Sequence, residues 1–242
     1  MMYAIFYISS IRICIFEFKK RMRLMYQVRV APLFFRRENT FSRMYHAEKV
    51  DHLWRRVFLF IFLTMLVYIS SAWFGLGMDV ISTRATSLTF EDYEVRKLFF
   101  LFGRALFGLI FAILILFGSP FLLWMFTGIP YRKLIALHLP ILMVLLIERI
   151  FWIIMLVNTG LDWYVSPISF GIITSYFTDI PWIIYFFGAI SVVQLWIVWF
   201  KIKTVHYFTK WKRWQAWLLV IMLHMIYWSA TAAIAHVDVY FL

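Results

Sequence analysis

The sequence predicts an all-α membrane protein: a polytopic bundle of five transmembrane helices, with the N-terminus in the cytoplasm and the C-terminus outside. Three observations lead to this prediction. The chain has 242 residues and is 64% hydrophobic, whereas soluble domains are about 45–50% apolar. The apolar residues gather into runs long enough to cross a bilayer, which takes about 20 residues of helix. The basic residues are concentrated in alternate segments between these runs.

Residues 1–30 form an N-terminal extension that does not fit the five-span pattern. Its first 18 residues are largely apolar but include Arg12 and Glu17, and a basic cluster follows them. A secretory signal peptide has the opposite order. Three interpretations stay open: an interfacial or extra short membrane helix, a degenerate signal anchor, or a mis-assigned start with the protein beginning at Met22 or Met25. We favour the last, because the next segment resembles a normal cytoplasmic lead-in.

Residues 31–56 are predicted to be this cytoplasmic lead-in, with an amphipathic helix. Helical spacing after Pro32 places five apolar side chains on one face and charged side chains on the other. Such a helix suits the inner leaflet of a membrane, although a solvated basic segment would have a similar composition. The apolar face consists of Phe41, Met44, Tyr45, Leu53 and Trp54.

The five spans belong to one transmembrane domain, residues 57–242. Between the third and fourth spans, residues 158–180 are apolar but contain Pro167 and Gly171, which make a regular span unfavourable. We expect this segment to be an outer interfacial or re-entrant element that covers the bundle. The spans themselves are predicted at residues 57–78, 98–126, 134–160, 181–200 and 214–237.

The orientation follows from the lysine and arginine counts. From the N-terminus onward, the segments outside the spans contain twelve, three, two, none, five and none of these residues. Basic residues in short loops face the cytoplasm, so the N-terminus is expected inside and the C-terminus outside the cell membrane. The net charge of +12 is therefore explained by topology rather than by binding of nucleic acid.

Three charged residues lie within the spans: Arg104 in the second, and Glu148 and Arg149 in the third. Charged side chains inside a membrane are costly, so they are usually paired or functional. Arg104 and Glu148 have similar expected depths at 1.5 Å per helical residue, which predicts an ion pair between them. We favour such a pair as a structural link between helices. A polar cavity for a substrate or partner, or a lipid-facing arrangement, are the alternatives.

The sequence gives no sign of an enzyme, a cofactor or a metal site. Cys14 is the single cysteine, so a cysteine-based zinc site is excluded. His138, His224 and His236 lack the helical spacing that one metal ion requires, and we expect them to be satisfied or interfacial. Glu148 is the only acidic residue within a span, whereas an intramembrane enzyme needs several polar groups at one depth. We therefore expect a protein without catalytic activity.

The chain resembles the Yip family, five-span membrane proteins named for interaction with Ypt/Rab-type GTPases. The likeness covers about residues 31–242 and rests on the N-in, C-out layout, the lead-in and the inner turn GIPYRKLIALHLP at 128–140. The resemblance implies a non-enzymatic accessory or assembly factor of a membrane complex. Bacterial members suggest an ABC-type exporter of peptides or toxins as that complex. In the lead-in the resemblance rests on Ala31, Pro32, Phe34, Phe35 and Phe41.

We expect such a protein to bind other membrane subunits through its cytoplasmic basic surface and through the fifth span, in addition to the lipid bilayer. The alternative is a permease-like subunit whose own substrate pathway uses Arg104, Glu148 and Arg149. The identity of the partner, any substrate and the oligomeric state do not follow from the sequence. The predicted basic surface comprises Arg36, Arg37, Arg132, Lys133, Lys201, Lys203, Lys210, Lys212 and Arg213.

Overall fold

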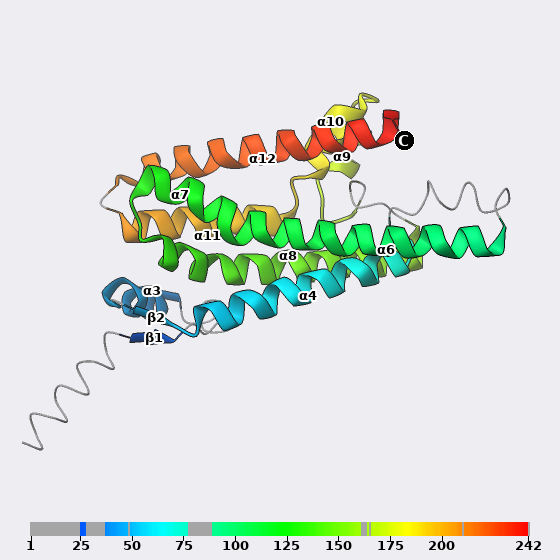
Figure 1. The fold of residues 1–242 in the computed structure, drawn as a ribbon. Coiled ribbons are helices and arrows are strands. Elements are labelled where there is room, and N and C mark those ends of the chain that lie inside the picture. Colours follow the sequence, from blue (N-terminus) through cyan, green and yellow to red (C-terminus); the bar gives the residue numbers. More distant parts are fainter. Residues whose placement is uncertain are drawn as a thin grey trace, which may run out of the picture.

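The structure, a computed structural model, is a long helical bundle with one pair of short strands within the described residues (Figure 1). It describes residues 25–27, 37–47, 49–76, 89–160, 164, 166–209 and 211–241. Most of the predicted extension 1–30 lies outside these ranges, as do Arg36 and Lys210.

Successive helices run along the bundle in opposite directions (Figure 1). Among the described residues, four helices are long and apolar enough to cross a membrane. This matches a multi-pass membrane protein and the predicted first, second, third and fifth spans. The four are α4 (Leu53–Trp73), the continuous stretch of α6 (Phe90–Ile113), η1 (Leu114–Gly118) and α7 (Ser119–Thr127), α8 (Tyr131–Thr159), and Arg213–His236 of α12 (Arg213–Phe241).

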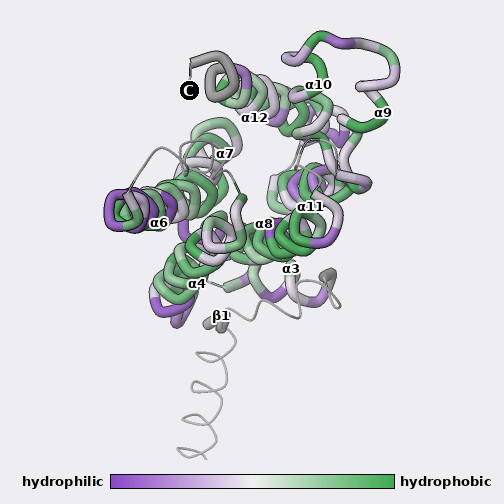
Figure 2. The backbone as a smooth tube through the Cα atoms, turned by 90° about the vertical axis from the view of Figure 1, so that its right-hand side faces the viewer, coloured by the Kyte–Doolittle hydropathy of each residue, from purple (hydrophilic) through white to green (hydrophobic). Residues whose placement is uncertain are grey.

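The fourth predicted span, 181–200, is wrong as a single helix. The structure divides it into α10 (Pro181–Gly188) and α11 (Val192–Phe208), with a break at residues 189–191. The second piece continues beyond residue 200, so it includes the start of the predicted inner loop 201–213. With 17 residues, α11 is about 26 Å long, at the short end of the range for a span. It runs back along the bundle, between α8 and α12 (Figures 1 and 2).

Helix α8 lies at the centre of the bundle and contacts α4, η1, α7 and α11 (Figure 2). Its residues from Leu134 to Leu142 are all buried, as expected for a helix that is apolar on every side. Around it, the outward surfaces of α4, α6 and α12 expose many large apolar side chains, such as Phe58, Phe102 and Ile226. An exposed apolar surface of this extent is unfavourable in water and is expected where lipid surrounds the protein.

Helix α3 (Arg37–His46) is the amphipathic helix expected in the lead-in, but it ends at His46. Its buried residues Phe41 and Met44 pack against one end of the bundle, where the Phe41 ring lies 5.8 Å from that of Phe200. Tyr45 and Trp54, which the helical spacing placed on the same face, are exposed. Strand β2 (Lys49–Asp51) follows and pairs in parallel with β1 (Met25–Gln27).

Two ends of the bundle can be distinguished (Figure 1). The α3 end includes α3, the α7–α8 turn at 128–130 and the α11–α12 connection at 209–212. The opposite end, the α9 end, includes the last turn of α4, the short helix α9 (Gly171–Ser175), α10 and the end of α12. Here α9 and α10 pack on each other, and α10 packs on the side of α12 (Figures 1 and 2). The stretch α6–η1–α7 extends beyond its neighbours at this end.

Candidate functional site

Glu148 is buried in α8 and accepts a short hydrogen bond from the hydroxyl of Ser191. Ser191 is the residue that begins α11, and its oxygen also accepts a hydrogen bond from the backbone N–H of Gln194 at 3.1 Å. A side-chain oxygen in this position caps a helix N-terminus, where negative charge is favourable. The carboxylate of α8 is therefore hydrogen-bonded to the residue at the break in the predicted fourth span.

The predicted ion pair between Arg104 and Glu148 is wrong. Within the described residues, Glu148 has no salt bridge to an arginine, and Arg104 donates from Nη2 to the backbone carbonyl of Leu76 at 2.6 Å. That carbonyl follows Gly75, whose φ of +96° ends α4 in a turn that alanine or larger residues adopt poorly. Arg104 thus joins α6 to the end of α4. The depths were similar, but the side chains point to different neighbours.

Arg149 points away from Glu148, as expected for adjacent residues on a helix. Its guanidinium carbon lies 4.7 Å from the centre of the Tyr68 ring and 5.6 Å from that of Trp152. A cation over the face of an aromatic ring is stabilised by the ring quadrupole. Each of the three charged residues of the spans therefore makes a contact that joins its helix to another element: Glu148 to the start of α11, Arg104 to the end of α4, and Arg149 to Tyr68 of α4.

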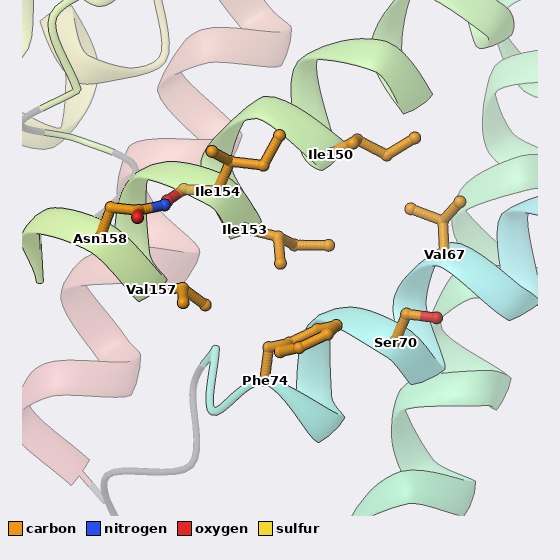
Figure 3. A pocket seen from close by; sticks show the side chains of 8 residues that line it. All are labelled: Val67, Ser70, Phe74, Ile150, Ile153, Ile154, Val157 and Asn158. Carbon is orange, nitrogen blue, oxygen red and sulfur yellow. The ribbon is translucent and has the colours of Figure 1, made fainter.

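A groove of about 400 Å³ lies between α4 and α8 toward the α9 end (Figure 3). Figure 3 shows apolar side chains from both helices facing it, with Ser70 and Asn158 as the polar ones. Neither Arg104, Glu148 nor Arg149 lines it. The groove is suited to an apolar chain rather than to a charged solute. Its lining residues are Val67, Ser70, Phe74, Ile150, Ile153, Ile154, Val157 and Asn158.

A cluster of polar side chains, here named the inner cluster, lies nearer the α3 end and was not predicted from the sequence. It consists of Ser119 of α7, His138 of α8 and Lys201 of α11. Lys201 Nζ donates to Ser119 Oγ at 2.9 Å, and Ser119 Oγ lies 3.1 Å from His138 Nε2. The consecutive helices α7 and α8 meet α11, which is distant in sequence, at these side chains. Convergence of this kind at one depth was the feature that the sequence did not reveal.

The direction of the hydrogen bonds in the inner cluster follows from the acceptors. His138 Nδ1 lies 2.8 Å from the carbonyl oxygen of Leu134, which can only accept, so Nδ1 carries the hydrogen. In a neutral imidazole Nε2 is then an acceptor. Ser119 accepts from Lys201 and donates to Nε2. The result is a continuous chain of donors from Lys201 through Ser119 to His138.

The backbone is irregular around the inner cluster. Pro120 cannot donate to the preceding turn and its ring crowds the carbonyl four residues earlier. The helix responds with the π turn η1 (Leu114–Gly118), in which the backbone N–H of Ser119 bonds to the carbonyl of Leu114. Pro140 likewise removes one hydrogen bond within α8, two residues after His138. π turns are frequent at functional sites.

His224 of α12 is a further buried histidine. Its Nδ1 lies 2.8 Å from the carbonyl of Val220, and its ring faces Trp228 at 5.7 Å. The expectation that His138 and His224 are satisfied histidines is met for both Nδ1 atoms. No group of three or more potential metal ligands occurs among the residues that the structure describes.

The predicted basic surface is found at the α3 end where it is described, with one correction. Lys201 is not in a loop, because α11 continues to Phe208, and its side chain points into the bundle. Lys133 is half-buried and donates to the carbonyl of Tyr45 at 2.8 Å. Arg37 belongs to α3, without a described side chain. The remaining described members, Arg132, Lys203, Lys212 and Arg213, are exposed.

In comparisons with known proteins, no protein-family model, no curated protein and no solved structure matches the chain.

Proposed function

We propose that this chain is a five-pass protein of the cell membrane that serves, without catalysis, as an accessory or assembly subunit of a larger membrane complex. In this proposal the fourth pass is formed by α11 together with its capped start. The α3 end faces the cytoplasm and the α9 end faces outward. An ABC-type exporter of peptides or toxins is the complex that the resemblance to the Yip family suggests.

The charge distribution supports this orientation. Exposed bases at the α3 end include Arg43, Arg132 and Lys212, whereas the exposed acids Glu91, Asp92 and Asp179 lie toward the α9 end. Lysine and arginine near span ends favour the cytoplasmic side. Helix α3 and the 209–212 connection lie at the same end of the bundle, an arrangement that supports an odd number of passes with α12 as the last.

The observation that carries the accessory role is the use of the charged residues within the spans. Glu148 binds the start of α11 through Ser191, and Arg104 binds the end of α4 through the Leu76 carbonyl. Each connects two elements, and neither lines the groove between α4 and α8. This argues against a permease pathway built on Arg104, Glu148 and Arg149, which is the alternative function.

The surface of α12 is the candidate for the partner interface. This helix packs on α10 and α11 and leaves Met222, Ile226 and Ile234 exposed. Ser229 and Ala233 of the same helix are small residues four positions apart, a spacing that allows another helix to approach closely. A partner helix from the complex fits this face.

Site-specific photocrosslinking in cells tests the proposal. A photoreactive residue is placed at Ile226 or Ile234, and at Phe62 of α4 as a control that is similarly exposed. We expect a crosslink to another membrane subunit from α12 and none from Phe62. Crosslinks to lipid alone from all three positions would contradict the accessory role. Loss of a transport activity in Glu148→Gln, with unchanged folding, would support the permease instead.

A further inference from the structure

Lys201 is a cation inside the bundle without a carboxylate beside it. Among the described residues it forms no ion pair, and its Nζ donates a hydrogen bond to the neutral hydroxyl of Ser119. A charged amine in low-dielectric surroundings is unfavourable unless its proton is shared or compensated. The inner cluster provides a second base, His138 Nε2, on the far side of the same hydroxyl.

The hydroxyl between the two bases restricts the inner cluster to a small set of states. With Lys201 charged, Ser119 accepts from Nζ and donates to His138 Nε2. With His138 charged, Nε2–H donates to Ser119, and the hydroxyl donates in turn to the neutral amine of Lys201. In both arrangements Lys201 Nζ, Ser119 Oγ and His138 Nε2 each take part in a hydrogen bond, and the cluster carries one excess proton. Two protons would place two cations on either side of one oxygen atom, where they repel each other.

We propose that Lys201, Ser119 and His138 form an intramembrane binding site for a single proton, which passes between the two bases through the serine hydroxyl. In the transfer, an Nζ–H bond of Lys201 breaks and a new O–H bond forms on Ser119. The original O–H bond of Ser119 breaks and its proton forms an N–H bond with His138 Nε2. The net charge of the cluster stays at +1.

The charged and titratable groups around Lys201 are compatible with this site. Helix α12 contributes His224, whose Nδ1 is bonded to the Val220 carbonyl. On α11 itself, Lys203 is exposed and lies 5.9 Å from the Trp199 ring. From α8, Lys133 bonds to the Tyr45 carbonyl and the Tyr131 hydroxyl to that of Phe117. Helix α3, which contacts α11, has Arg43, Tyr45 and His46 as its titratable groups with described side chains, and all three are exposed.

The position of the site suggests how a proton would reach it and what it would change. Lys201 is half-buried and seven residues from the end of α11 at Phe208, about 10 Å from the α3 end. The α3 end is the nearer of the two ends of α11, so we expect the proton to enter from that side. Pro120 and Pro140 interrupt the hydrogen bonding of α7 and α8 here. A shift of charge from α11 to α8 therefore acts on the least regular part of the bundle.

Nitrogen NMR of the full chain in lipid nanodiscs, with ¹⁵N-labelled histidine and lysine, tests the proposal. At neutral pH we expect His138 to be neutral with its hydrogen on Nδ1. The pH midpoint at which Nε2 of His138 takes up a proton is then measured in the natural chain and in each variant. In Lys201→Met the neighbouring charge is lost, and the midpoint of His138 should rise by about one pH unit or more. In Lys203→Met, the matched control on the same helix, it should not move.

Two further variants keep the test decisive if Lys201→Met does not fold. Lys201→Arg retains the cation but cannot release its proton, so His138 should remain neutral to at least as low a pH as in the natural chain. Ser119→Ala removes the bridge, and the signal of His138 Nε2 should change to that of a nitrogen without a hydrogen bond. Equal midpoints for His138 in the natural chain and in Lys201→Met, or a neutral His138 that carries its hydrogen on Nε2 instead of Nδ1, would overturn the proposal.

Discussion

Ser191, the N-cap residue of helix α11, donates its hydroxyl hydrogen to Glu148 of α8, so the buried carboxylate and the break in the predicted fourth span form one structural unit. Ser191 Oγ also caps the new helix by accepting from the backbone of Gln194. This contact explains why an acidic residue can be accommodated within α8. It also explains why an apolar run of predicted transmembrane length does not form a single helix.

The contact between Glu148 and Ser191 should depend on the acceptor oxygen rather than on the charge. Glu148→Gln keeps an acceptor, and we expect it to reduce the free energy of unfolding by less than about 1 kcal/mol. Glu148→Leu leaves the serine hydroxyl unpaired and should cost about 1–2 kcal/mol. Unfolding in mixed micelles by titration with SDS measures both. Ile147→Ala, next to it on the exposed side of α8, is the control. An equal loss in both Glu148 variants would show that charge matters instead.

The contact between Arg104 and Leu76 should hold the last turn of α4 in place. In Arg104→Leu, the amide hydrogens of Gly75 and Leu76, which bond to the carbonyls of Ala72 and Ser71, should exchange faster, by roughly tenfold if about 1.4 kcal/mol is lost. Hydrogen exchange with mass spectrometry of the peptide that covers residues 70–76 measures this. Arg96→Leu, near the exposed start of α6, should leave the rate unchanged. No change in Arg104→Leu would mean that the bond does not stabilise the turn.

Two glycines of α6 provide a matched test of how closely α4 and α6 pack. A Cβ atom at Gly108 would lie 3.0 Å from Cβ of Tyr68 and 3.3 Å from Cα of Met65, whereas one at Gly103 would meet nothing within 4 Å. Gly108→Ala should therefore destabilise the protein by about 1–3 kcal/mol. Gly103→Ala should be neutral or stabilising, because alanine is the better helix former. The same SDS titration applies. Equal effects of the two variants would refute the close approach.

The close packing of α9 on α10 depends on the absence of a side chain at Gly171. A Cβ atom there would lie 2.0 Å from the backbone oxygen of Tyr164 and 2.9 Å from Cα of Gly188. Because these are backbone atoms, Gly171→Ala must displace α9 from α10. We expect faster proteolysis within residues 164–190 in this variant than in Ser175→Ala, on the exposed side of the same short helix. Equal cleavage rates would show that α9 tolerates the extra methyl group.

The long apolar helices could be predicted because length and hydropathy alone determine them. The third span was expected at 134–160 and is Tyr131–Thr159. The fourth failed because the sequence from Ser191 to Gln194 carries a helix-start signal within an apolar run. A serine followed three residues later by glutamine is typical of a capped helix N-terminus. That signal was present in the sequence and was masked by hydropathy.

The polar contacts were less predictable because depth along a helix does not give direction around it. Arg104 and Glu148 were expected to meet at similar depth, yet each bonds to a different element. The inner cluster depends on the π turn before Ser119 and on the continuation of α11 beyond Phe200. Neither feature follows from composition, although Pro120 within an apolar run is a local signal for an irregular helix.

In the proposed topology α11 crosses the membrane, so that the chain makes five passes with the α3 end in the cytoplasm. A membrane-impermeant maleimide applied to intact cells tests it, with single cysteines at Asp179, Arg132 or Lys212 in a Cys14→Ser background. All three positions are exposed in the structure. We predict that the cysteine at Asp179 is labelled in intact cells, and that those at Arg132 and Lys212 are labelled only after the membrane is permeabilised. Labelling of the cysteines at positions 179 and 212 from the same side would show that α11 does not cross the membrane.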